Sequence, residues 1–310
     1  MDDLAGQGAP DAGEFGAAET QAPPPFTLIL PRLQMLPVIV SSPHSGRFYP
    51  PEFLAASRLD ALAIRRSEDF LVDELFAGAP AQGCCLIAAN YPRAYLDLNR
   101  EPYELDPQMF RDPLPAHANT RSQRVTAGLG AIPRVVREGA EIYREKLSFA
   151  EAERRLRSIH APYHAALQAL IETTLARFGC AILLDAHSMP SCAGAEDRDF
   201  GLPRADVVLG DRFGASCAGA VTRAAERSFA GLGFRTQRNH PYAGGYSTEI
   251  YGRPRAGVHA LQVEINRALY MDEERIARGP GFSRLKNDLR SLLMTLGALD
   301  LASLRPPRAA

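Results

Sequence analysis

Short, uniformly apolar runs that end in polar residues constrain the fold of this chain most strongly. The clearest run covers residues 180–184 and leads directly into Asp185 and His187. Similar runs cover residues 36–41, 84–89, 207–209 and 261–265, and a shorter one covers residues 95–98. Strands that are apolar at every position, rather than at alternate positions, are typical of sheets covered on both faces.

Stretches with helical patterning separate these runs. They cover residues 58–77, 148–159, 162–178, 212–232 and 283–296. Ser148 and Glu151 have the spacing of a capping box, and Pro162 is expected to kink the helix or to begin a new one. The alternation predicts an α/β fold, a single domain with a central, mostly parallel or mixed sheet flanked by helices. Residues 101–138 read as a long irregular connection.

Composition limits the environment and the partners of the protein. Residues 1–25 hold few large apolar side chains and are expected to form a disordered leader before a folded domain over residues 26–310. The 35 basic and 36 acidic residues nearly cancel, which argues against a strongly basic nucleic-acid-binding protein. Neither a signal peptide nor an apolar stretch of membrane-spanning length is visible. Five cysteines without a CxxC pair favour a reducing compartment, so a cytoplasmic protein is expected.

Polar side chains gather where the predicted strands end. His44 and His187 follow two of the apolar runs, and the segment from Asp97 to Arg100 follows another. Glu264 lies near the end of the last predicted strand. Ligands of α/β sheets bind at the carboxyl ends of the strands, so these groups are expected to converge.

Two imidazoles and a carboxylate are the ligand types of a catalytic zinc ion. The acidic pair Glu68 and Asp69 offers the oxygen ligand, and the residue types alone leave the choice open. An unligated carboxylate must then move protons, and Glu264 is our candidate. The arginines near Asn99 are suited to bind a substrate carboxylate.

Structural roles compete with each of these assignments. A histidine after a strand is often a hydrogen-bonded structural residue. His160 and His164 also have ligand spacing, but no glutamate of an HExxH motif accompanies them, so core or capping roles are favoured. The pair Gly244 and Gly245 indicates either left-handed backbone or a close approach to a ligand.

Several motifs occur together in a specific order. They are Ser42-Pro-His-Ser-Gly46, Asp97-Leu-Asn-Arg100, Pro162-Tyr-His164, Leu184-Asp-Ala-His-Ser-Met189, Gly210-Asp-Arg-Phe-Gly-Ala-Ser-Cys217, Pro241-Tyr-Ala-Gly-Gly245 and Gln262-Val-Glu-Ile-Asn-Arg-Ala-Leu-Tyr-Met271. As an ordered set over residues 36–275 they resemble the N-formylglutamate amidohydrolase family, whose fold is similar to that of zinc carboxypeptidases.

The resemblance implies a catalytic domain over residues 26–310 and a role for each motif. It implies zinc ligands at His44, Asp69 and His187, with Asp69 preferred to Glu68 because the family pattern ends in Asp before an aromatic residue. It implies a general base at Glu264, and catalytic and substrate-binding roles at Arg100. The remaining implied substrate-binding residues are Arg93, Asn99, Gly244, Gly245 and Tyr246.

The expected activity is removal of the N-formyl group from an N-formylated acidic amino acid by a zinc-activated water. In its best-known family role this reaction converts N-formylglutamate to glutamate and formate and ends one route of histidine degradation. Alternatives are a hydrolase of another N-acyl amino acid or small peptide, and a non-catalytic metabolite-binding protein. Cobalt or manganese can use the same ligand set, and the sequence does not indicate an oligomeric state.

Overall fold

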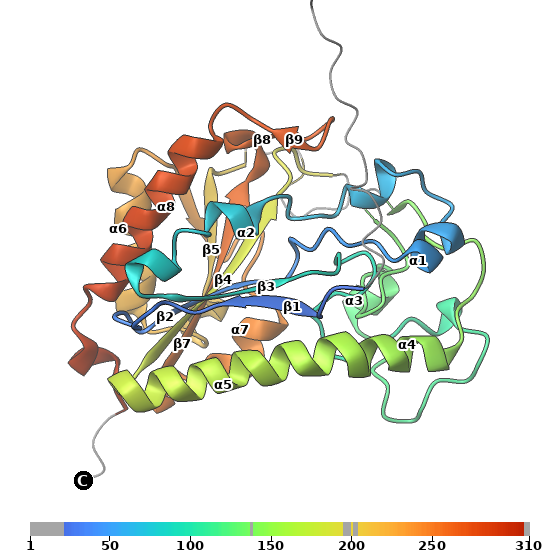
Figure 1. The fold of residues 1–310 in the computed structure, drawn as a ribbon, viewed down its shortest axis with the longest axis horizontal. Helices are drawn as coiled ribbons and strands as arrows, with labels where there is room; N and C mark the ends of the chain where they lie inside the picture. The colour runs from blue at the N-terminus through green and yellow to red at the C-terminus, as the bar shows by residue number, and fades with distance from the viewer. Residues whose placement is uncertain (1–21, 137–138, 195–199, 201–203, 307–310) are drawn as a thin grey trace, which may run out of the picture.

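A seven-stranded mixed sheet forms the centre of the protein, with the strand order β1-β3-β2-β4-β7-β5-β6 (Figure 1). The computed structural model describes residues 22–136, 139–194, 200 and 204–306. The strands are β1 (Phe26–Ile29), β2 (Val38–Ser42), β3 (Cys85–Ala89), β4 (Ala181–Met189), β5 (Val207–Gly210), β6 (Thr236–Arg238) and β7 (Val258–Asn266), and a separate small sheet pairs β8 (Met271–Asp272) with β9 (Ala277–Arg278).

Strands β3, β2, β4 and β7 run parallel to one another in the middle of the sheet. At the two sides, β1 is antiparallel to β3, and β5 is antiparallel to β7 and parallel to β6. The sheet is therefore mixed, as the apolar runs predict. The carboxyl ends of its four central strands meet at one edge.

Helices cover both faces of this sheet (Figure 1). They are α1 (Pro51–Ala56), α2 (Val72–Leu75), α3 (Gln123–Thr126), α4 (Phe149–Arg155), α5 (Ala161–Phe178), α6 (Gly219–Gly231), α7 (Tyr246–Tyr251) and α8 (Phe282–Gly297). Short 3₁₀ segments are η1 (Ala63–Arg65), η2 (Pro80–Gln82), η3 (Pro107–Met109), η6 (Arg212–Gly214), η7 (Pro254–Ala256), η8 (Arg267–Leu269) and η9 (Leu301–Leu304). Helices α2, α6 and α8 pack on one face, and α4 and α5 pack on the other.

Alternate residues of one strand enter two different cores. Val38 and Val40 face the core of α2, α6 and α8, whereas Ile39 between them faces the core of α5. Leu184 and Leu183 divide in the same way along β4. Burial on both faces explains why these strands have no polar alternation, and each buried aliphatic side chain contributes about 1.5–3 kcal/mol.

The long helix predicted over residues 58–77 is wrong. The segment forms η1, a series of turns and the short α2. Leu71 adopts a left-handed conformation with φ of 56°, which interrupts helical hydrogen bonding. The backbone N–H of Asp69 donates to the carbonyl of His44 at 3.1 Å instead of to a helical partner. Tertiary contacts of the acidic pair override the helical pattern here.

The strand predicted over residues 95–98 is also wrong. The backbone N–H groups of Tyr95 and Leu96 both donate to the carbonyl of Pro92, which makes this segment a buried turn. Apolar composition reports burial at these positions, and burial does not require a strand. The connection over residues 101–138 is irregular as predicted, apart from η3, α3 and the two residues 137–138, which lie outside the described ranges.

One helical rod runs from α4 into α5 through a π-helical segment, η5 (Leu156–His160). Its start is capped as predicted, because the Ser148 hydroxyl accepts a hydrogen bond from the N–H of Glu151 at 3.2 Å. Pro162 lacks the N–H that an α-helix would direct at the fourth preceding carbonyl. The wider turn at η5 accommodates this proline, so the helix continues instead of ending.

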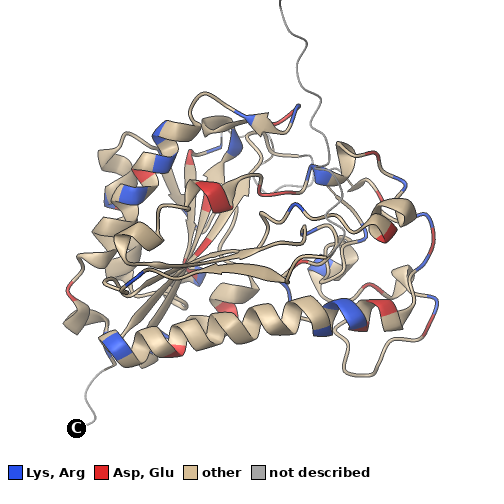
Figure 2. Cartoon of the chain, in the orientation of Figure 1, with Lys and Arg blue, Asp and Glu red and all other residues tan. Residues whose placement is uncertain are grey.

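Residues 1–21 of the predicted leader lie outside the described residues. The rest of it, residues 22–25, contacts the domain, since the carbonyls of Pro24 and Pro25 accept hydrogen bonds from Asn90. Acidic and basic residues are interspersed over the helices and loops (Figure 2). Among the described helices, none is both long and apolar enough to cross a membrane.

Candidate active site

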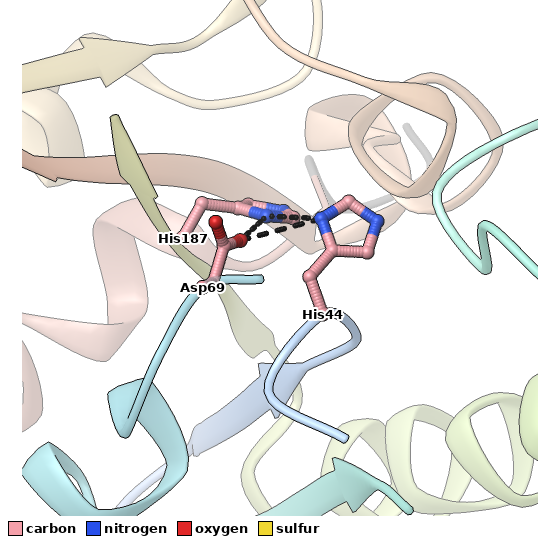
Figure 3. Close-up of side chains that lie close together, drawn as sticks. All are labelled: His44, Asp69 and His187. Atoms are coloured by element: carbon pink, nitrogen blue, oxygen red, sulfur yellow. Dashed lines mark hydrogen bonds and ion pairs between the residues drawn. The ribbon is translucent and has the colours of Figure 1, made fainter. Parts of the chain in front are cut away.

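Three side chains predicted as metal ligands lie together at the carboxyl edge of the sheet (Figure 3). His44 follows β2, Asp69 lies in the turns before α2, and His187 lies in β4, which extends further than the predicted strand. The Nδ1 atoms of the two histidines are 3.1 Å apart. Oδ2 of Asp69 is 3.0 Å from Nδ1 of His187 and 3.3 Å from Nδ1 of His44.

The cluster has the spacing of a tetrahedral metal site. Ligand atoms about 2.0 Å from a zinc ion are separated by about 3.3 Å along each edge of the tetrahedron. The three facing atoms of His44, Asp69 and His187 are separated by 3.0–3.3 Å. All three side chains are buried, and imidazole nitrogen and carboxylate oxygen are the donor types zinc prefers. These residues therefore fit a divalent metal.

The other nitrogen of each ring faces a second buried carboxylate. Nε2 of His44 is 2.6 Å from Oδ1 of Asp97, and Nε2 of His187 is 3.0 Å from Oδ2 of Asp185. A carboxylate at Nε2 favours the tautomer with its proton there, which leaves the Nδ1 lone pair free to bind a metal. Both rings are thereby oriented toward the centre of the cluster.

Glu68 and Asp69 point to different partners, and only Asp69 faces the two histidines. Glu68 accepts hydrogen bonds from Tyr49 at 2.6 Å and from Arg65 at 2.9 and 3.2 Å. Asp69 turns toward the histidines. Its second oxygen, Oδ1, accepts a hydrogen bond from Ser188 at 3.2 Å and lies 3.4 Å from the guanidinium of Arg267.

The buried imidazoles and carboxylates of the cluster shift one another's pKa values toward the charged forms. Burial opposes ionisation of Asp69, yet the hydrogen bonds and charges of His187 and His44 hold its pKa well below its usual range. Burial likewise opposes protonation of His187, but the charge of Asp185 raises its pKa well above the usual value. The two shifts are reciprocal, because the imidazoles stabilise the carboxylate of Asp69 and the carboxylates stabilise the protonated ring of His187.

Glu264 lies beside the cluster. It pairs with His187 in the register of the parallel strands β4 and β7, so both side chains project from the same face of the sheet. One of its oxygens, Oε1, accepts a hydrogen bond from Gln262 at 2.8 Å. Burial raises the pKa of Glu264, and the nearby charge of Asp69 adds to this effect. The carboxylate is thus close to the cluster without being one of the three grouped donors.

The two candidate arginines have different hydrogen-bond partners. Arg93 donates to Oδ2 of Asp97 at 2.7 Å, and the charges of Asp69 and Glu264 are among those that raise its pKa. Arg100 donates to the carbonyls of Leu129 and Asn99 at 3.0 and 2.9 Å. Burial lowers the pKa of Arg100 to about 10. Arg93 is therefore the arginine that interacts more closely with the cluster.

The side-chain amide of Asn99 makes its hydrogen bonds to other residues of the protein. Its Nδ2 donates to Asp185 at 2.9 Å and lies 3.0 Å from Nε2 of His187, and its Oδ1 accepts from the N–H of Ser247 at 2.7 Å. Because Nε2 of His187 carries a proton in the metal-binding tautomer, the Asn99 amide acts on this ring through Asp185, whose Oδ2 faces both groups. The family resemblance instead implies contact of Asn99 with the substrate.

Gly244 and Gly245 directly precede helix α7, and Gly245 lies against Asn99. A Cβ on Gly245 would lie 2.5 Å from the Asn99 amide, so this glycine permits a close approach of backbone to side chain. Gly244 has a φ of 128°, which other residues rarely adopt. Tyr246 follows at the start of α7 and lines a cavity of about 370 Å³ with Glu101, Glu104, Asn119, Arg124, Glu249 and Ile250.

Sequence reasoning missed Asp97 as the partner of His44, and it missed Ser188 and Arg267 as partners of Asp69. The signal for Asp97 was its place after a buried run, beside Asn99 and Arg100. Arg267 lies within the motif over residues 262–271, but its partner Asp69 is brought to it only by the tertiary fold.

An α/β fold that brings two imidazoles, a carboxylate and a separate buried glutamate to one sheet edge has the composition of a metallohydrolase site. Comparisons with known proteins identify the family. Residues 36–271 match the N-formylglutamate amidohydrolase family. The chain belongs to this family.

Individual relatives agree with that assignment. N-formylglutamate deformylase of Pseudomonas aeruginosa is 32% identical over 242 residues, covering 77% of this chain and 84% of that protein. The enzyme of the same name from Pseudomonas putida is 29% identical over 249 residues, covering 77% and 83%. The crystal structure of N-formylglutamate amidohydrolase from Ralstonia eutropha JMP134 is 36% identical with a TM-score of 0.79, covering 88% of this chain and 95% of that one. A structure from Agrobacterium tumefaciens, 15% identical with a TM-score of 0.63 over the same shares, has the same fold.

Proposed function

We propose that this protein hydrolyses the formamide bond of N-formylglutamate, releasing formate and glutamate. The observation that carries the proposal is the mutual approach of His44, Asp69 and His187 with Glu264 free beside them. The names of the relatives from Pseudomonas and Ralstonia supply the substrate. The proposed compartment is the cytoplasm, and no further partner is required beyond the small substrate.

His44, Asp69 and His187 hold the metal in this proposal, and zinc is the proposed ion. When bound, zinc polarises a carbonyl oxygen and lowers the pKa of a water molecule to about 7. Asp97 and Asp185 keep the two imidazoles in the tautomer that binds metal. Ser188 and Arg267 orient the carboxylate of Asp69.

Glu264 is the proposed general base. It takes a proton from the attacking water as the water oxygen bonds to the formyl carbon. The carbon–nitrogen bond then breaks, and Glu264 returns the proton to the departing amine. Its raised pKa suits this role, because a base must hold the proton between the two steps.

Arg93 and Arg100 have proposed roles at two different groups of the substrate. The charges of Asp97, Asp69 and Glu264 raise the pKa of Arg93. Arg93 is the proposed group that stabilises the negative charge developing on the formyl oxygen. Arg100 is the proposed partner of a substrate carboxylate, and its bonds to two backbone carbonyls hold the guanidinium in a fixed orientation. Gly244, Gly245 and Tyr246 form the proposed wall of the substrate site.

A substrate panel tests the proposed activity. Amine release from N-formylglutamate, N-formylglutamine, N-formylalanine and N-acetylglutamate is measured with the zinc-loaded protein. The proposal predicts the highest kcat/KM for N-formylglutamate. Faster turnover of the acetylated compound would indicate a different N-acyl amino acid as substrate, and no turnover of any compound would indicate a binding protein.

A further inference from the structure

His160 is buried and His164 is half-buried, and the proposed reaction uses neither. His160 ends the π-helical segment η5, and His164 lies one turn later in α5. Their rings stack with centroids 4.3 Å apart and planes inclined by 29°. Stacking two imidazoles this closely requires that they are not both charged, and burial indeed lowers the pKa of each.

Both rings direct Nε2 at the backbone carbonyl of a residue next to Asn99. Nε2 of His160 is 3.0 Å from the carbonyl of Arg100, and Nε2 of His164 is 2.8 Å from the carbonyl of Leu98. A carbonyl only accepts hydrogen bonds, so each Nε2 carries the proton and donates. The two bonds fix the peptide that precedes Asn99 and the peptide that follows Arg100.

Asn99 is the residue between these two fixed carbonyls, and its amide donates to Oδ2 of Asp185, the same oxygen that lies 3.0 Å from Nε2 of His187. The segment has no helix or strand of its own to satisfy its carbonyls. Donors must therefore come from elsewhere, and two neighbouring turns of the helical rod supply them. The position of the Asn99 amide depends on these two bonds.

The histidine pair also contacts the segment that follows Gly245. The Tyr251 hydroxyl donates to Nδ1 of His164 at 2.8 Å, and the ring of Tyr246 meets the ring of His164 edge-on at 5.6 Å. Helix α7 also supplies the N–H of Ser247 to Asn99. Figure 1 shows α7 between α5 and the central strands.

We infer that His160 and His164 are positioning residues that hold Asn99, and through it the metal ligand His187, in the orientation the reaction needs. The expected effect on turnover rests on the proposed function. The expected effect on metal affinity does not, since it depends only on the orientation of His187. The wide π-helical turn before Ala161 belongs to this arrangement, because it accommodates Pro162 while the two rings stay stacked.

Zinc affinity tests the inference without depending on the substrate. His164→Phe keeps an aromatic ring in the stack but removes the donor to Leu98. We expect the zinc Kd, measured by competition with a chelator, to rise about 10-fold, the range found for residues that orient metal ligands. His164→Gln restores a donor and should recover most of that loss. Gln168→Ala, at a partly exposed position of the same helix, is the matched control and should bind zinc like the wild type.

A double-mutant cycle then separates positioning from general stability. If His164 acts through Asn99, His164→Phe should weaken zinc binding little further in an Asn99→Ala background. Equal and additive losses in both backgrounds would overturn the inference, as would wild-type zinc affinity in the His164→Phe protein. If His164→Phe does not fold, Tyr251→Phe enters the same cycle with the same two outcomes.

Kinetics give a second readout when the protein is active. The positioning role predicts a fall in kcat with KM little changed. An increase in KM alone would contradict it. Absence of turnover in the wild type would contradict the proposed function, while the zinc measurements would still decide the role of the histidine pair.

Discussion

Nε2 of His44 lies 2.6 Å from Oδ1 of Asp97, and both side chains are buried. This contact determines which nitrogen of His44 faces His187 and Asp69. Asp97 also accepts a hydrogen bond from Arg93, so one carboxylate joins the metal cluster to the proposed substrate site. The arrangement predicts that Asp97 influences both metal binding and turnover.

Asp97→Asn should weaken zinc binding about 10- to 100-fold, because an amide no longer selects the Nε2–H tautomer of His44. Zinc Kd by chelator competition is the measurement. Asp106→Asn is the matched control, since Asp106 is also buried and pairs with Arg134 in the 101–138 connection. Equal zinc affinity in the two variants would contradict the role assigned to Asp97.

Asp69→Asn and Glu68→Gln should behave differently. The first removes a charged metal ligand, and we expect the purified protein to contain far less than one zinc ion per chain. The second removes the ion pair with Arg65 and should lower the free energy of unfolding by about 1–3 kcal/mol while the zinc content stays unchanged. Elemental analysis and urea unfolding check both. Loss of zinc from the Glu68→Gln protein would show that the ligand is assigned wrongly.

Glu264→Gln should separate metal binding from catalysis. The amide occupies nearly the same volume but cannot take up a proton, so kcat should fall about 10²- to 10⁴-fold. Zinc content should remain at the wild-type level because Glu264 is not among the three grouped donors. A variant that keeps near-normal kcat would remove Glu264 from the mechanism.

His164 should make the protein sensitive to acid. Burial lowers its pKa in the folded protein to about 3, whereas in the unfolded chain histidine has a pKa of about 6.5. Between these values the unfolded chain binds the additional proton. The free energy of unfolding should therefore fall as the pH decreases, by up to about 1.4 kcal/mol per pH unit from this residue.

Urea unfolding of the metal-free protein at pH 7, 6 and 5 measures this slope without interference from zinc release. His164→Gln lacks the titrating group, and its free energy of unfolding should depend less steeply on pH. The same slope in both proteins would mean that His164 is protonated in the folded state.

Strands β2, β3, β4, β5 and β7 were predictable because burial on both faces leaves a plain signal in the sequence, whereas the largely exposed edge strands β1 and β6 carry no such signal. Strands β2 (Val38–Ser42) and β4 (Ala181–Met189) each begin with an uninterrupted apolar run, and the polar residues toward their carboxyl ends mark the site. The segment around Asp69 was not predictable in the same way. Its apolar residues have helical spacing, but the left-handed backbone at Leu71 and the hydrogen bond of the Asp69 N–H to His44 interrupt the helix, and Asp69 faces the two histidines.

The candidate ligands were found through residue type, position after strands and resemblance to a family. Their supporting residues were not, because Asp97, Ser188 and Arg267 act across long separations in the chain. Asn99 was assigned to the substrate, whereas its amide contacts His187 and Asp185. The distinction depends on side-chain direction, which sequence spacing does not specify.

Titration of the metal-free protein with zinc, with formate release from N-formylglutamate followed at each step, tests the central claim most directly. If His44, Asp69 and His187 form one catalytic metal site, activity starts near zero, rises in proportion to added zinc and saturates at one ion per chain. Full activity before any metal is added would contradict the account.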